Sequence, residues 1–128
     1  MTHSQSSTAW IFLAIARSDG GSLEDFFAAA DHINVAIPSD REIENAVNRL
    51  CSSGLVEVIG NRFSLTGRGS ELFERVGGYS EYPRRQPEMI EPLLRKALGS
   101  TMIKSDWHVD PAETAAALRQ YSTKHSKA

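Results

Sequence analysis

The sequence predicts a mainly helical protein with one small β-hairpin, followed by C-terminal helices. Three observations carry this prediction. Apolar residues recur at helical spacing in several segments, Gly60-Asn61 separates two short β-prone runs, and glycines or prolines mark most segment ends. With 128 residues, of which 41% are apolar and 23% charged, the chain has the size and composition of one ordinary globular domain.

Three helices are expected in the first part of the chain. Hydroxyl residues precede an apolar run, which predicts a helix over residues 8–18 that ends at Gly20-Gly21. Ser22 can cap a second helix over residues 23–32. The residues Ser39-Asp-Arg-Glu42 are typical of a capping box, so the third helix is expected to begin near residue 40. Its apolar stripe consists of Ile43, Ala46, Val47 and Leu50.

A hairpin and a fourth helix follow. Gly54 is a natural helix stop, and residues 55–59 and 62–65 are β-prone on either side of a tight two-residue turn. Thr66 can cap the next helix, which we expect to end at Gly77-Gly78.

The second part of the chain is expected to be helical after a linker. Residues 79–87 contain two prolines and no apolar periodicity, so they divide a domain over 1–78 from a helical section over 88–128. Pro92 suggests that the next helix starts near Glu91, because proline is best tolerated in a first turn. The last helix is marked by Asp110-Pro111-Ala112-Glu113, which places a cap, a first-turn proline and a third-position acid in sequence, and it should run to about Tyr121.

The element order over residues 8–77 resembles the winged helix-turn-helix superfamily, and in particular its transcription regulators. The most specific stretch runs from Asn48 to Phe73 and is similar to the family pattern of Leu-x-x-x-Gly-Leu, a hairpin, and then Leu-Thr-x-x-Gly. The matching positions here are Leu50, Gly54, Leu55, Leu65, Thr66 and Gly69.

The resemblance implies a DNA-binding site. In such a protein the third helix would enter the major groove while the hairpin tip touches the DNA backbone or the minor groove. By position this nominates Ser39, Arg41, Asn45, Asn48, Arg49, Asn61 and Arg62. Arg, Asn and Ser are suitable groups for contacting base edges or phosphates.

The charge distribution favours a different partner. The net charge of the chain is −2, and residues 1–78 hold six arginines against ten acids, a net of −4, whereas residues 79–128 have a net of +2. Asp40, Glu42 and Glu44 lie among the nominated DNA contacts, where they would face a polyanion. The leading hypothesis is a DNA-binding transcription regulator, and the alternative is a winged-helix module that binds a protein and not DNA.

Several charged residues have an ordinary interpretation beside the functional one. Arg41 and Arg49 can pair with nearby acids on the same helix instead of DNA, and Arg62 can act as an edge charge that discourages strand aggregation. Arg84-Arg85 lie beside two tyrosines, which suits either a stacking nucleic-acid contact or a solubilising loop.

The sequence offers no candidate for catalysis, and we expect a protein that is not an enzyme. The four histidines are scattered, no zinc-ligand spacing exists, and no glycine-rich phosphate loop follows a strand, so neither a metal nor a cofactor is expected. Cys51 is interpreted as a partly buried structural thiol, with redox sensing as the alternative.

The remaining expectations concern compartment and assembly. A single cysteine and the lack of a membrane-length apolar run favour a cytoplasmic protein without a membrane partner. The helical section brings more apolar side chains than a small winged core needs. This surplus predicts a homodimer through residues 88–122 where the helices project away from the core, and the alternative is that they fold back as a lid on their own domain. The side chains expected at that interface are Ile90, Leu93, Leu94, Leu98, Trp107, Leu118 and Tyr121.

Overall fold

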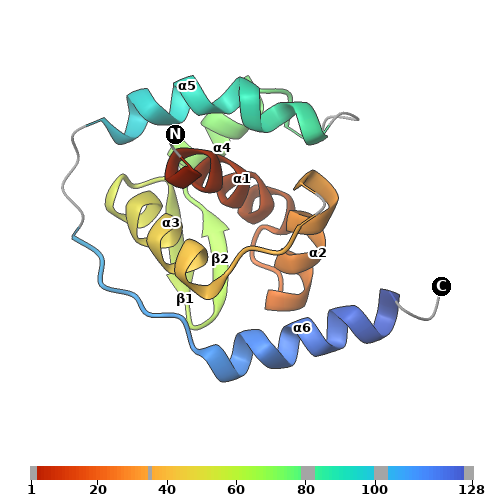
Figure 1. The fold of residues 1–128 in the computed structure, drawn as a ribbon. Coiled ribbons are helices and arrows are strands. Elements are labelled where there is room, and N and C mark those ends of the chain that lie inside the picture. The colour runs from red at the N-terminus through yellow and green to blue at the C-terminus, as the bar shows by residue number, and fades with distance from the viewer. Residues whose placement is uncertain (1–2, 35, 79–82, 100–103, 126–128) are drawn as a thin grey trace.

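The computed structural model describes residues 3–34, 36–78, 83–99 and 104–125, which fold into the arrangement of Figure 1. The elements are α1 (His3–Ser18), α2 (Leu23–Asn34), α3 (Asp40–Ser52), β1 (Val56–Ile59), β2 (Arg62–Leu65), α4 (Gly67–Arg75), the short 3-10 helix η1 (Pro83–Arg85), α5 (Gln86–Leu98) and α6 (Pro111–His125). The predicted fold class is confirmed: the chain is mainly helical, and one small antiparallel hairpin follows the third helix.

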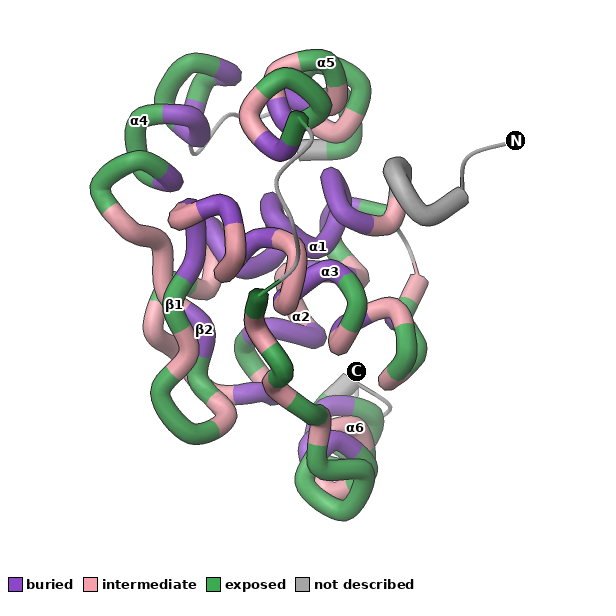
Figure 2. Tube along the Cα trace, turned by 90° about the vertical axis from the view of Figure 1, so that its left-hand side faces the viewer, coloured by how far each residue is buried: buried purple, intermediate pink, exposed green. Residues whose placement is uncertain are grey.

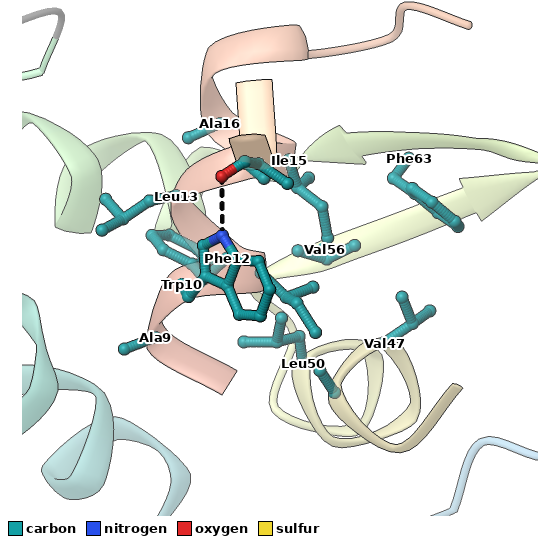
Figure 3. Close-up of a cluster of buried hydrophobic side chains, with 14 of the residues drawn as sticks. Ala9, Trp10, Phe12, Leu13, Ile15, Ala16, Val47, Leu50, Val56 and Phe63 are labelled. Atoms are coloured by element: carbon teal, nitrogen blue, oxygen red, sulfur yellow. Dashed lines mark hydrogen bonds between the residues drawn. The ribbon is translucent and has the colours of Figure 1, made fainter. Parts of the chain in front are cut away.

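Helix α1 lies at the centre of the fold. Every residue from Thr8 to Ala16 is buried, so the helix is covered all round by α2, α3, α5 and the hairpin. Figure 3 shows its side chains meeting Leu50 of α3, and the indole Nε1 of Trp10 donates a 2.9 Å hydrogen bond to the carbonyl of Ala30 in α2. A helix that is apolar on all faces has to be placed inside the core, and the other elements are assembled around it.

Helix α3 begins with the predicted capping box. The Glu42 amide donates to Ser39 Oγ at 3.1 Å, and the Ser39 amide donates to Glu42 Oε1 at 2.9 Å. The predicted apolar stripe is buried, as Ile43, Ala46, Val47 and Leu50 are each at most 1% exposed. These two features fix where the helix starts and which of its faces points outward.

The turn between α3 and the hairpin explains part of the family-like motif. Gly54 has a φ of +75°, and the Leu55 amide donates back to the Leu50 carbonyl, so Leu55 belongs to the helix exit and β1 begins one residue later than expected. In the hairpin, Val56 lies opposite Leu65.

The end of the motif is explained by a close approach between two segments. Thr66 caps α4 by accepting from the Gly69 amide at 3.1 Å, as expected. A Cβ placed on Gly69 would lie 2.1 Å from the Leu55 carbonyl oxygen. A glycine is therefore required three residues after this threonine, because α4 packs its backbone against the helix exit.

The start of α5 differs from the prediction. The helix begins at Gln86, not near Glu91, and the proline in its first turn is Pro87. Pro92 lies inside the helix at an exposed position. Because proline has no N–H, the backbone carbonyl of Glu88, four residues earlier, receives no hydrogen bond from it, and Glu88 is exposed as well. Water can hydrate that carbonyl, which is why the helix continues through the proline.

Gln86 joins three elements at this point. Its side chain is 1% exposed, Nε2 donates to the carbonyls of Val76 and Gly78 at 3.1 and 2.6 Å, and Oε1 accepts from Arg17 Nη2 at 2.7 Å. The buried amide thus fastens the start of α5 to the end of α4 and to α1.

Helix α6 packs against α2 on the side of the molecule opposite α5 (Figure 1). The hydroxyl of Tyr121 donates to a carboxylate oxygen of Asp31, and Lys124 Nζ lies 2.6 Å from Glu24 Oε2. These contacts continue the helix to residue 125, beyond its expected end at Tyr121.

The apolar faces that motivated the homodimer prediction are covered within one chain. Ile90, Leu94, Leu98 and Tyr121 are buried, while Leu93, Trp107 and Leu118 are partly buried against the same core. The helices therefore fold back onto the core of their own chain, which is the alternative arrangement, and the condition on which the homodimer expectation depended is not met.

Smaller differences concern element ends. Helices α1 and α2 extend to residues 3 and 34, beyond the expected 8 and 32. Of the expected linker, residues 79–82 lie outside the described residues, 83–85 form η1, and 86–87 belong to α5. None of the described helices has an apolar stretch long enough to cross a membrane.

Candidate interaction face on α3

The outward face of α3 consists of two parallel rows of polar side chains, each with a spacing of four residues. Glu44, Asn48 and Ser52 form one row, which we call the strap row. Arg41, Asn45 and Arg49 form the other, which we call the open row. Both rows follow from helical periodicity, because residues four apart lie one above the other on a helix surface.

The strap row holds an extended segment from the C-terminal part of the chain. Residues 104–110, here called the strap, lie in the segment that connects α5 to α6, and they run past α3 and the β1–β2 hairpin (Figures 1 and 2). The Asn48 side chain donates to the Trp107 carbonyl at 2.8 Å and accepts from the Trp107 amide at 2.9 Å. Asn48 also accepts from the Ser105 hydroxyl at 2.6 Å.

The other two members of the strap row continue the same pattern. Ser52 Oγ accepts from the amides of Lys104 and Ser105 at 2.8 and 3.1 Å, and Glu44 Oε1 accepts from the amide of Val109 at 2.8 Å. Each member of the row therefore accepts a backbone N–H of the strap, and the members meet residues 105, 107 and 109 in turn. The row binds an extended peptide through its backbone.

The hairpin is engaged by the same C-terminal region. The rings of Trp107 and Phe63 meet edge to face with centroids 5.4 Å apart, and Asn61 Nδ2 donates to Glu113 of α6 at 3.0 Å. Arg62 Nη1 donates to the Gly20 carbonyl at 3.0 Å. Both nominated hairpin residues are thus used inside the chain.

The open row borders a hollow between α3 and the start of α1. The hollow has a volume of about 190 Å³ and is lined by Ser7, Thr8, Ser39, Arg41, Glu42, Asn45, Ala46 and Arg49. Within the described part of the chain, no ion pair or hydrogen bond engages the guanidinium group of Arg41 or Arg49. Two cations therefore face one hollow without an internal partner.

The one carboxylate in that hollow is already in use. Glu42 accepts from the Ser39 amide at 2.9 Å and from the Ser7 hydroxyl at 2.7 Å, and these hydrogen bonds, the Ser39 backbone first, lower the pKa of Glu42 against the opposing effect of its burial. Glu42 stays ionised, but its two oxygens point to capping groups of its own helix and of α1. The lining retains a positive charge.

A second, smaller hollow adjoins the first. It has a volume of about 60 Å³, lies between α3 and α5, and shares Thr8 and Arg49 with the larger hollow. Leu94 and Leu98 give it an apolar side. Glu91 and Arg95 also line it, and their charged groups lie 3.8 Å apart. A small hollow with one apolar wall thus lies directly beside the arginine that ends the open row.

The seven residues nominated from the sequence are divided by the structure. Ser39, Arg41, Asn45 and Arg49 line the same hollow, whereas Asn48 faces the strap, and Asn61 and Arg62 face α6 and the turn before α2. Sequence reasoning missed Glu44, Ser52 and Trp107. The i, i+4 spacing of Glu44, Asn48 and Ser52 was a usable signal for a second polar row, but it did not indicate the partner.

Other reactive groups lie outside this face. Cys51 is half-buried, and desolvation, with a contribution from the charge of Glu57, raises the pKa of its thiol, which is the behaviour of a structural cysteine. Among the described residues, no group of His, Cys, Asp or Glu side chains could hold a metal ion.

No protein-family model, curated protein or solved structure matches the chain.

Proposed function

We propose that the chain is a winged-helix module that binds a protein partner through α3, and not a DNA reader. The observation that carries this proposal is the strap, which occupies α3 by side-chain hydrogen bonds to its backbone. A helix that already holds an extended peptide has the chemistry of a peptide-binding element.

The strap also opposes a role for α3 in a major groove. The groove is about 12 Å wide and accommodates one helix, so a second segment lying on the outward face of α3 would have to be removed first. Asp106 and Asp110 are exposed on the strap and Glu113 follows at the start of α6, which places negative charge where DNA phosphates would come. The net charge of −4 over residues 1–78 acts in the same direction.

A photocrosslinking experiment tests the proposal with the full chain. A photoreactive amino acid placed at the exposed Asn45 should give a covalent adduct with one protein from a native lysate, and nuclease treatment should leave the adduct unchanged. The same amino acid at Glu71, an exposed position on α4, serves as the control and should not give that adduct. A nucleic-acid adduct at position 45, or the same proteins at both positions, would contradict the proposal.

DNA binding remains the second candidate because of the open row. Arg41 and Arg49 have no partner among the residues that the structure describes, and they lie on the helix that the family resemblance assigns to the groove. Contacts with phosphates need such groups. A labelled mixed-sequence duplex titrated at low salt distinguishes the two candidates. Binding by the full chain that weakens with salt and with Arg41→Ala/Arg49→Ala would favour DNA, and its absence at tens of micromolar protein would remove that candidate.

A further inference from the structure

We infer that the open row, Arg41, Asn45 and Arg49, is a binding site for an extended acidic peptide of a partner protein, with an aliphatic side chain of that peptide in the hollow between α3 and α5. This inference rests on the proposed function and adds the chemistry of the partner.

The strap shows that the spacing of a row of side chains on α3 matches the spacing of residues in an extended peptide. Glu44, Asn48 and Ser52 are four residues apart on α3, about 6 Å along the helix axis. They meet Val109, Trp107 and Ser105, which are two residues apart on the strap, or about 6.6 Å in an extended chain. A row of this period on a helix therefore matches alternate residues of an extended peptide running beside it.

The open row has the same period and opposite chemistry. Arg41 and Arg49 lie eight residues apart, about 12 Å along the helix, and four residues of an extended peptide span about 13 Å. The strap row presents mainly acceptors for backbone amides, whereas the open row presents guanidinium donors at both ends. Carboxylates four residues apart in the partner would meet the two guanidinium groups, and the Asn45 amide between them would meet the peptide backbone.

The charge balance of the hollow selects an anion. Arg41 and Arg49 have no internal partner among the described residues, and the single carboxylate beside them, Glu42, is turned to Ser39 and Ser7. Ser39 adds a hydroxyl at the N-terminal end of the row, beside Arg41. A basic peptide would be repelled by the two guanidinium groups, and a neutral peptide could offer them only carbonyl oxygens. Carboxylates form stronger, charge-assisted hydrogen bonds with guanidinium groups, so acidic residues in the partner are favoured.

The adjoining hollow adds a preference for an aliphatic residue. It is lined on one side by Leu94 and Leu98, and Arg49 lies at its junction with the larger hollow. A volume of about 60 Å³ suits a small aliphatic side chain placed next to the carboxylate that pairs with Arg49.

An array of random decapeptides, probed with the full chain, tests this inference. The bound peptides should be enriched in acid pairs four residues apart with an aliphatic neighbour. The variant Arg41→Glu/Arg49→Glu should bind them at least about tenfold more weakly, because two attractive pairs become repulsive. The control Arg84→Glu/Arg119→Glu makes the same change of charge at exposed arginines outside α3 and should bind as the wild type does.

A second variant guards against a folding defect. Glutamate near the C-terminal end of α3 opposes the helix dipole, so a variant that only removes the charges, Arg41→Gln/Arg49→Gln, is the second test. It should weaken binding by less than the glutamate variant does, with an unchanged thermal transition. Bound peptides without an acidic excess, or equal binding by the glutamine variant and the wild type, would overturn the inference. Binding of a mixed-sequence DNA duplex, but of no peptide, through these two arginines would overturn it as well.

The outcome can be separated from that of the proposed function. If the position 45 adduct forms equally in the wild type and in the Arg41→Gln/Arg49→Gln background, the protein-binding function stands and the acidic-peptide inference fails. If no protein adduct forms in either background, the proposed function itself fails.

Discussion

Replacing Asn48 by alanine tests whether the strap is held on α3 by this side chain. The substitution removes three hydrogen bonds, two to Trp107 and one to Ser105, with donor–acceptor distances of 2.6 to 2.9 Å. At about 1 kcal/mol for each, the strap should lose about 3 kcal/mol of its docking free energy. The freed strap groups are half-buried and can reach water, so a further penalty for unpaired polar groups is not expected.

Native-state hydrogen exchange measures this loss at the affected atoms. A reduction of about 3 kcal/mol in the free energy of local opening corresponds to exchange about 100-fold faster at the Trp107 amide. The amide of Val109, which depends on Glu44, should accelerate as well if the strap opens as a unit. The free energy of global unfolding should fall by less, because α1 and its neighbours keep their packing.

Asn45 provides the matched control. It has the same side chain, lies on the same helix one turn earlier, is exposed, and makes no hydrogen bond with the strap. Asn45→Ala should leave exchange at Trp107 unchanged. Equal exchange in the Asn48 and Asn45 variants would refute the reasoning, because the strap would then be held by something other than the strap row.

Three further predictions concern the fold. Gly69→Ala should lower the free energy of unfolding by about 2–3 kcal/mol in urea, because its Cβ would meet the Leu55 carbonyl at 2.1 Å, whereas Gly67→Ala has open space and should be neutral or slightly stabilising. Burial and the hydrogen bond to Asp31 raise the pKa of Tyr121 to about 12 from 10.0. The protonated hydroxyl therefore contributes fully to the free energy of unfolding below pH 10, and this contribution is lost as the pH rises towards 12. Tyr121→Phe should remove this pH dependence from a plot of the free energy of unfolding against pH. Light scattering should give the mass of one chain, since the C-terminal helices cover their own core, and a stable dimer mass would contradict this.

The sequence predicted those parts of the fold that depend on local signals. The capping box of Ser39 and Glu42, the positive φ of Gly54 and the cap by Thr66 each involve residues within a few positions of one another. The apolar stripe of α3 was equally visible, because a period of 3.6 residues marks the buried face of a helix. Such signals located α3, and with it four residues that share one hollow.

The sequence could not predict the strap. Asn48 and Trp107 are 59 residues apart, and the hydrogen bonds between them join a side chain to backbone groups that every residue possesses. Residues 104–110 have no helical or alternating pattern, so nothing indicated that they would lie on α3. The sequence also did not indicate that α5 begins at Gln86. This residue is polar, and its burial depends on hydrogen bonds to the backbone carbonyls of Val76 and Gly78, which no sequence pattern predicts.

The net charge of residues 1–78 is negative, whereas the open row of α3 is positive, and the positions of the acids on α3 explain this difference. Counted along the sequence, Asp40, Glu42 and Glu44 make α3 acidic, which argued against DNA as its partner. In the structure Asp40 lies in the first turn, where the helix dipole favours it, Glu42 closes the capping box, and Glu44 accepts from the strap. The acids of α3 are thus used within the chain, and the surface that remains for a partner carries Arg41 and Arg49. A domain with a net charge of −4 can therefore present a cationic row, and binding to that row should weaken as salt screens it.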